Sequence, residues 1–306
     1  MTINFLIPSR PTHASVEEAL VDIIGAGPQP MVFGFGETHP NSVLLETLKV
    51  PTPEQRFQAQ VMPVLAREYG VTHFGFERLP VDLNPLFGGY FGATLDSPLP
   101  ESIVKIFDGY RDEFLYNNGL FEGDKEMDEA VGHERETFQQ YRGCVTAYLQ
   151  ELRGHCQSIG KKVHIRGWMI ESFFHFMTVT GVIQPGPAIF KDMNANAIGL
   201  VDEALLWGGM IALYGGWNHP NVRGSEDASY VPSIQERLGS LEGYRDVRIV
   251  APEYILLRDD TYVHNNETLR LSQEAPLEGV LLVQRGPQSF TLVFPRTPLF
   301  EVFKSG

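Results

Sequence analysis

The sequence has few cysteines and no long apolar run. Its two cysteines, Cys144 and Cys156, fall in a helical pattern, twelve positions apart. That spacing is roughly 18 Å along a straight helix, too far for a disulfide. The most apolar segment, 204–217, is shorter than a membrane-spanning helix, and the first residues lack the basic region of a signal peptide. We therefore expect reduced thiols, no membrane partner and a cytoplasmic location.

Basic residues are also scarce. The 306 residues include 24 Lys and Arg against 38 Asp and Glu, so the formal net charge is −14 at pH 7. Such a surface repels phosphate backbones, and we expect no nucleic-acid partner. The hydrophobic fraction of 43% is enough for a substantial core. The length permits a single α/β domain over residues 1–306.

Two common hydrolase signatures are missing. No Gly-x-Ser-x-Gly sequence occurs, which argues against a serine esterase of the usual kind. No His-Glu-x-x-His sequence occurs either, which argues against a metalloprotease built on one helix. Any catalytic site must therefore be assembled from residues that lie apart in the sequence.

Apolar segments of strand length alternate with helical patterns along the chain. Capping boxes, Ser15-Val-Glu-Glu18 and Thr52-Pro-Glu-Gln55, precede the first two helices. Further helices are predicted over 187–206 and 232–241. Predicted strands are 31–35, 72–76, 161–167, 210–214, 248–250, 279–285 and 289–294. This order predicts an α/β fold with a mostly parallel central sheet flanked by helices and an antiparallel C-terminal hairpin at Gly286-Pro287.

The alternation breaks between residues 79 and 160. This part is read as a largely helical insertion after the second strand, at the sheet edge where the strand ends. An insertion at that place is suited to act as a lid, and the alternative is packing or an oligomer interface. Within it, residues 87–91 are Phe-Gly-Gly-Tyr-Phe and are predicted as a loop that carries aromatic side chains over a pocket.

Polar residues follow the apolar segments at three predicted strand ends. Glu37 and His39 come after the first strand, Glu77 ends the second, and His219 follows the fourth. The carboxyl ends of parallel strands meet at one edge of a sheet, where open α/β folds bind ligands. We therefore expect Glu37, His39, Glu77 and His219 to converge in one pocket as the catalytic residues.

Two imidazoles with one or two carboxylates suit a divalent metal such as Zn²⁺, Mn²⁺ or Co²⁺. In that arrangement His39, Glu77 and His219 hold the metal, and Glu37 is the general base or a second carboxylate. The same residues also work without a metal, because a histidine held by a glutamate deprotonates water directly. The sequence leaves both mechanisms open.

Three more residues are candidates for substrate binding. Arg166, on the third predicted strand, is expected to clamp an oxyanion or carboxylate, and the alternative is a buried salt bridge. Trp217 and Asn218 directly precede His219, so both are expected to contact the substrate.

These motifs resemble a superfamily that joins ChaN-like haem-binding lipoproteins, TraB/Tiki proteins and erythromycin esterases. The matching marks are Gly36-Glu-x-His39, Glu77 at the end of the second strand, Gly216-x-x-His219, and the polar helix with Asp192-Met-Asn-Ala-Asn196 before the last of these. The resemblance implies an α/β fold with helical insertions and a polar cleft at the sheet edge. It assigns the site to Glu37, His39, Glu77 and His219.

The branches of this superfamily imply different functions. Tiki-like members are regarded as metal-dependent peptidases with two Gly-x-x-His motifs, both present here. Erythromycin esterases hydrolyse a macrolactone, but their first motif has one more residue between Glu and His. ChaN-like members share the Glu-x-His spacing and bind haem, but this chain shows no lipoprotein signal.

From these branches we predict a hydrolase that acts on an ester, lactone or amide/peptide bond of a small-molecule or peptide substrate. A haem- or metal-binding protein without catalysis is the first alternative. A natural-product tailoring enzyme that uses the same acid–base site for cyclisation or elimination is the second.

Overall fold

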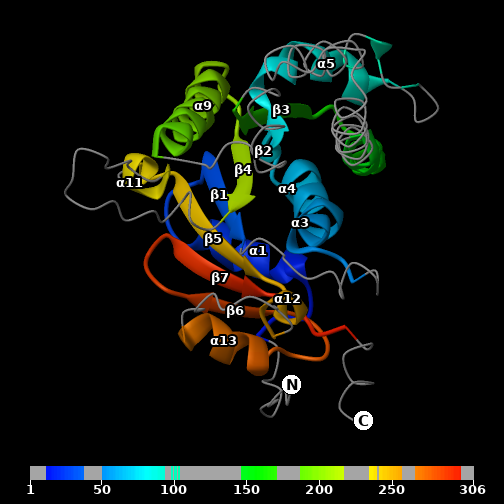
Figure 1. The fold of residues 1–306 in the computed structure, drawn as a ribbon. Helices are drawn as coiled ribbons and strands as arrows, with labels where there is room; N and C mark the ends of the chain where they lie inside the picture. The colour runs from blue at the N-terminus through cyan, green and yellow to red at the C-terminus, as the bar shows by residue number, and fades with distance from the viewer. Residues whose placement is uncertain are drawn as a thin grey trace, which may run out of the picture.

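A seven-stranded sheet with the order β3-β2-β4-β1-β5-β7-β6 forms the centre of the chain, here in a computed structural model (Figure 1). The structure describes residues 12–37, 50–93, 98, 100, 101, 103, 146–170, 187–216, 234–239, 241–256 and 266–297. All neighbouring strands are parallel except β6 and β7. The predicted fold class, a mostly parallel sheet with an antiparallel C-terminal hairpin, is confirmed.

The strands lie within a few residues of their predicted positions. Their bounds are β1 Val32–Glu37, β2 His73–Pro80, β3 His164–Met169, β4 Ile211–Gly216, β5 Tyr244–Val250, β6 Leu281–Gln284 and β7 Ser289–Val293. The first, second and fourth strands run past their apolar segments, so that Glu37, Glu77 and Gly216 belong to the sheet itself. Glu37 and Gly216 are paired in the ladder between β1 and β4, whereas Glu77 lies in an irregular stretch of β2 between Phe76 and Pro80.

Helices flank both faces of the sheet. Their bounds are α1 Val16–Gly25, α3 Pro53–Arg56, α4 Met62–Glu68, α5 Asn84–Gly92, α9 Pro187–Leu206, α11 Ile234–Leu238, α12 Pro252–Leu256, α13 Asn266–Gln273 and a helix over 146–159. A π-helical turn, Phe57–Val61, joins α3 to α4, and a 3₁₀ turn, Val81–Leu83, precedes α5. Thr52 caps α3 with both hydrogen bonds of the predicted capping box.

Two apolar cores cover the two faces of the sheet (Figure 1). On one face, Phe35 and Tyr214 pack against Phe57 of the π-helical turn, in the core that α1 and α4 share. On the other face, Trp168 and Leu213 share a core with α9 and α11. Because both faces are covered, β1, β4 and β5 are buried along their whole length, as in other parallel sheets.

The predicted loop at residues 87–91 is wrong, because these residues belong to α5. A proline in the first turn starts this helix, where its missing N–H costs nothing. Phe87, Tyr90 and Phe91 then fall on one side at helical spacing and are buried in the core. The aromatic side chains therefore pack inward.

The connection from β2 to β3, which lie side by side, contains the predicted insertion. Its described parts, apart from short segments, are helical: the 3₁₀ turn, α5 and residues 146–159. Its action as a lid and the single-domain organisation stay predictions.

Cys156 is buried with a free thiol whose pKa is raised by burial to about 12, and Cys144 lies outside the described residues. Across the described ranges, each helix is too short or too polar to cross a membrane.

Candidate functional site

Glu37 and Glu77 lie at the same edge of the sheet and are joined through the strand between them. The order β2-β4-β1 puts β4 in the middle, with Gly216 opposite Glu37. The hydroxyl of Tyr214 donates a 2.5 Å hydrogen bond to Oε2 of Glu37. The backbone N–H of Gly216 donates to Oε2 of Glu77. Both carboxylates are buried, so β4 supplies each of them with a hydrogen-bond donor.

A third buried carboxylate, Glu54, comes from α3. Its Oε2 accepts from Nε of Arg78 at 3.0 Å, and its Oε1 accepts from the hydroxyl of Tyr148 at 2.5 Å and from Nε2 of Gln58 at 3.3 Å. Arg78 directly follows Glu77 on β2. We refer to Glu37, Glu54, Glu77, Arg78, Tyr148 and Tyr214 as the carboxylate cluster.

Burial and neighbouring charges act on the pKa of two members of this cluster, Glu54 and Arg78. Burial raises the pKa of Glu54 to about 7, with further increases from Glu37 and Glu77 that oppose the effect of Arg78. Partial burial disfavours the charge of Arg78, but Glu54 and Glu37 outweigh it and raise its pKa. Arg78 is therefore the permanent cation of the cluster.

Both tyrosines of the carboxylate cluster are hydrogen-bond donors at all physiological pH values. Burial, and then the charge of Glu37, raises the pKa of Tyr214 well above its ordinary value. Burial, and then the charge of Glu54, does the same for Tyr148. Each hydroxyl therefore keeps its proton and aims it at a carboxylate.

Sequence reasoning missed Glu54 as a site residue because it stands inside a capping box, where an acidic residue has an ordinary role. A signal was present in the helical spacing. Glu54 and Gln58 lie on the same side as Phe57 and Val61, which are buried. Polar residues on an apolar helix face need buried partners. The π-helical turn that begins at Phe57 is a second signal, because such turns are frequent at functional sites.

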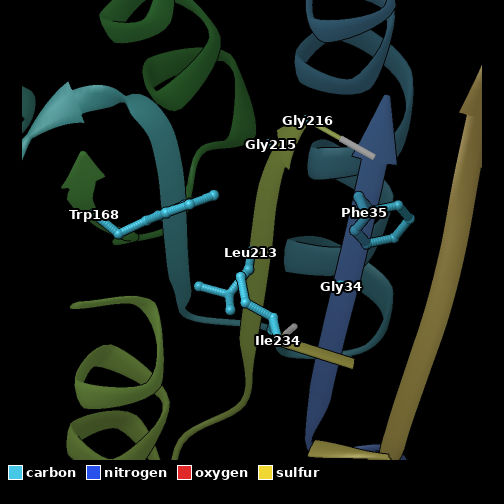
Figure 2. A pocket seen from close by; sticks show the side chains of 7 residues that line it. All are labelled: Gly34, Phe35, Trp168, Leu213, Gly215, Gly216 and Ile234. Carbon is cyan, nitrogen blue, oxygen red and sulfur yellow. The ribbon is translucent and has the colours of Figure 1, made fainter. Parts of the chain in front are cut away.

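The glycine at position 215 of β4 leaves room for the side chain of Glu77 beside this strand. A Cβ atom on Gly215 would lie 2.6 Å from Oε2 of Glu77 and would collide with the ring of Trp168. Trp168 projects from β3 across β2 toward β4 (Figure 2). A small apolar pocket is found here, lined by Gly34, Phe35, Trp168, Leu213, Gly215, Gly216 and Ile234. Because position 215 is a glycine, the side chains of Glu77 and Trp168 both fit against β4.

Arg166 lies on β3 in register with Gly75, before the strand ends. Its guanidinium stands 4.0 Å from Oε1 of Glu203 on α9, and one of its N–H groups donates to the carbonyl of Ile165. The side chain is 25% exposed, so this is a partly solvated ion pair on the α9 side. The role of Arg166 in substrate binding stays a prediction.

The other candidates, His39, Trp217, Asn218 and His219, lie outside the described residues. Their convergence with the carboxylate cluster stays a prediction. Within the ranges that the structure covers, no group of three or more His, Cys, Asp or Glu side chains is arranged to hold a metal ion.

Comparisons with known proteins give structural neighbours only. No family model matches the chain, and no curated protein matches it. Similar solved structures include the type III effector HopBA1, with 12% identity and a TM-score of 0.38 over 96% of this chain and 98% of that one. A mutant of the erythromycin esterase EreC in its open conformation has 12% identity and a TM-score of 0.36, over 92% and 79% of the two chains. A succinoglycan biosynthesis protein has 15% identity and a TM-score of 0.35, over 82% and 71%. One branch named from the motifs, the erythromycin esterases, is thus among the neighbours.

Proposed function

We propose that this chain is a hydrolase that cleaves an ester, lactone or amide bond at the carboxylate cluster. The observation that carries the proposal is that the buried carboxylates of Glu37 and Glu77 lie at one sheet edge, on either side of β4, each bound to a donor on that strand. Buried glutamates beside tyrosine hydroxyls and a guanidinium combine proton acceptors with donors in one place. Hydrolysis needs both, because water loses a proton while the leaving group gains one.

Each of the described site residues has its own role in this reaction. Glu37 and Glu77 accept protons from an attacking water, directly or through a histidine. Arg78 has a side chain that is 45% exposed, so it extends from the buried carboxylates toward solvent. A guanidinium at that place stabilises the negative charge that develops on a carbonyl oxygen. Tyr214 holds Glu37 in one orientation through its hydrogen bond.

The proposed hydrolysis has two forms, one assisted by a divalent metal and one that uses direct acid–base catalysis. His39, Glu77 and His219 would hold Zn²⁺, Mn²⁺ or Co²⁺, and a bound metal would lower the pKa of water and polarise the carbonyl. The carboxylate of Glu77 is present at the sheet edge and fits this donor set in type. Metal content and the effect of a chelator on turnover separate this form from direct acid–base catalysis.

The test is a substrate panel of esters, lactones and amides with variants of the predicted site. Glu77→Gln keeps the shape but removes the charge, so we expect turnover to fall by about 10²-fold or more. His219→Ala is expected to abolish turnover. Glu253→Gln is the control, because Glu253 on α12 is also buried but pairs with Arg56 of α3 at 3.1 Å. It is expected to lower only the melting temperature.

Other outcomes identify the alternatives. Near-normal turnover in both Glu77→Gln and His219→Ala contradicts the proposal. Haem-dependent absorbance in a protein without turnover supports the haem-binding alternative. A cyclised or eliminated product, in place of a hydrolysed one, supports the tailoring enzyme.

A further inference from the structure

The hydroxyl of Tyr244 is a buried polar group that has no role in the fold. Tyr244 begins β5 and is 1% exposed, and in the part of the chain that the structure describes no group hydrogen-bonds to its hydroxyl. The ring reaches over β1, because a Cβ atom on Gly34 would collide with the hydroxyl oxygen. Burial raises the pKa of this phenol well above its ordinary value, so the hydroxyl keeps its proton. An unpaired buried donor destabilises a fold, and phenylalanine would fill the same space without that effect.

Tyr244 lines a cavity of about 180 Å³ at the amino edge of the sheet, opposite the edge that holds the carboxylate cluster. The cavity lies between the start of β5, the end of α11 and the β6–β7 turn (Figure 1). The other residues that line it are Gly239, Asp246, Pro287, Gln288 and Ser289. One buried water needs only about 10–15 Å³, so this cavity has room for a small organic molecule.

Hydrogen bonds hold the walls of this cavity in place. The backbone N–H of Asp246 donates to the carbonyl of Gln288 at 2.9 Å, and Nε2 of Gln288 donates to the carbonyl of Glu242 at 2.9 Å. Asp246 is also in register with Ser289, the first residue of β7. These contacts connect the turn to β5 and to the segment before it. A ligand would therefore enter a preformed site and would not have to order it.

Asp246 supplies a carboxyl group beside the phenol. It is 4% exposed and in register with Gly34, the residue that the hydroxyl of Tyr244 covers. Burial raises the pKa of Asp246 to about 7, whereas the charges of Arg285 and Arg248 act in the opposite direction. A cation in the cavity would be repelled by these guanidinium groups, and an anion would be repelled by the carboxylate. The electrostatic environment therefore favours a neutral ligand.

A hydroxyl group is the neutral group that satisfies both side chains, because it accepts one hydrogen bond and donates another. It would accept from the phenol of Tyr244 and donate to the carboxyl of Asp246. We propose that this cavity is a binding site for a small neutral polyol, such as a monosaccharide or a cyclitol, with one hydroxyl bridging Tyr244 and Asp246. The site lies away from the carboxylate cluster and does not depend on the proposed hydrolysis.

The direct experiment is an NMR titration of the full chain labelled with ¹³C at the Cζ atom of tyrosine. The probes are glycerol, myo-inositol and glucose, and Tyr244→Phe identifies the signal of Tyr244. We expect that signal to shift in a saturable manner with at least one probe. The signal of Tyr254 should not shift, because its hydroxyl already donates to the carbonyl of Val50 at 2.7 Å.

Variants then test the two proposed contacts. Tyr244→Phe should weaken binding of the same probe by about tenfold, the effect of one hydrogen bond of ordinary strength. Asp246→Asn should weaken it as well, whereas Tyr254→Phe should leave the affinity unchanged. Without probe, the melting temperature of Tyr244→Phe should not fall, because the variant loses only an unpaired hydroxyl. A hydroxyl with a structural role would instead lower the melting temperature.

Several outcomes overturn the proposal. The first is the absence of a saturable shift with all three probes, and the second is an affinity that is unchanged in Tyr244→Phe. A crystal structure at saturating probe in which ordered water alone occupies the cavity is the third. Binding of tetramethylammonium or inorganic phosphate in place of the polyols would identify an ionic ligand and also overturn it. These measurements need no turnover, so failure of this proposal and failure of the hydrolase proposal are distinguishable.

Discussion

The two tyrosine–glutamate hydrogen bonds define the site at the scale of single residues. Tyr214 binds Glu37 and Tyr148 binds Glu54, both at 2.5 Å. A hydrogen bond to a charged group is worth about 1.5–3 kcal/mol, more than one between neutral groups. Because both carboxylates are buried, loss of a donor leaves an acceptor that water does not readily reach. These tyrosines therefore contribute to stability and to the orientation of the glutamates together.

Tyr214→Phe separates these contributions. The ring stays and keeps its packing on Phe57, while the hydrogen bond to Glu37 is lost. We expect the free energy of unfolding to fall by about 1–3 kcal/mol and turnover per folded molecule to fall as well. Tyr254→Phe is the control, since this buried hydroxyl donates to the carbonyl of Val50 instead. Denaturant unfolding and turnover are measured on the same samples, and equal effects on turnover in both variants would contradict the role of Tyr214.

The sequence predicted part of the site at this scale. Glu37 and Glu77 were found because each directly follows an apolar strand segment, a local signal. Tyr148 and Tyr214 were missed because their partners lie 94 and 177 residues away in the sequence. Such pairings depend on which strands and helices become neighbours. The three-dimensional arrangement therefore supplies them, and no local spacing does.

At the scale of elements, β4 organises the site. It lies between β1 and β2, provides a donor to Glu37 of the one and to Glu77 of the other, and has no side chain at position 215. Glu77 and Trp168 both occupy the space that a Cβ there would need. The sequence did not indicate what lies beside the glycines at the end of this strand. The structure identifies the approaching groups as a carboxylate and an indole ring.

Gly215→Ala tests this requirement. The added methyl group must displace Glu77 or Trp168, and overpacking of this kind costs about 1–3 kcal/mol. We expect lower stability together with loss of turnover, because Glu77 would move away from Gly216. Gly199→Ala on α9 is the matched control, since nothing lies within 4 Å of its added Cβ. That variant should be slightly more stable, by about 1 kcal/mol, because alanine favours a helix interior. Thermal unfolding and turnover of both variants provide the comparison, and an unperturbed Gly215→Ala would contradict the packing argument.

The sequence predicted helices correctly where the apolar pattern was long or where a capping box preceded it. The helix over 187–206 has the predicted bounds, and Thr52 caps α3 as expected. The failure at α5 has a physical reason. Gly88 and Gly89 suggested a loop, but the buried face with Phe87, Tyr90 and Phe91 outweighs the low helix propensity of two glycines. Tertiary packing therefore makes this segment helical.

At the scale of the whole molecule, the parallel sheet separates two groups of titratable residues. The carboxylate cluster lies at the carboxyl edge, whereas His73 and His164 begin β2 and β3 at the amino edge. These histidines are in register, and their rings stack with centroids 4.9 Å apart. The two groups respond to pH in opposite directions, because protonation relieves repulsion among the carboxylates and creates it between the imidazoles.

The histidine pair predicts a loss of stability in mild acid. Burial lowers the pKa of both rings below 6.5, with further decreases from Arg166 and, at His164, from Lys162, while Glu203 opposes them. As pH falls below 6.5 the unfolded chain binds protons that the folded chain does not, so the free energy of unfolding decreases. Glu54 works against this decrease over the same range, so absolute melting temperatures mix the two effects. Comparison with His164→Gln isolates the pair: from pH 8 to pH 5 its melting temperature should fall less than that of the wild type. His155→Gln, a change in the 146–159 helix, should follow the wild type, and parallel curves for wild type and His164→Gln would contradict the prediction.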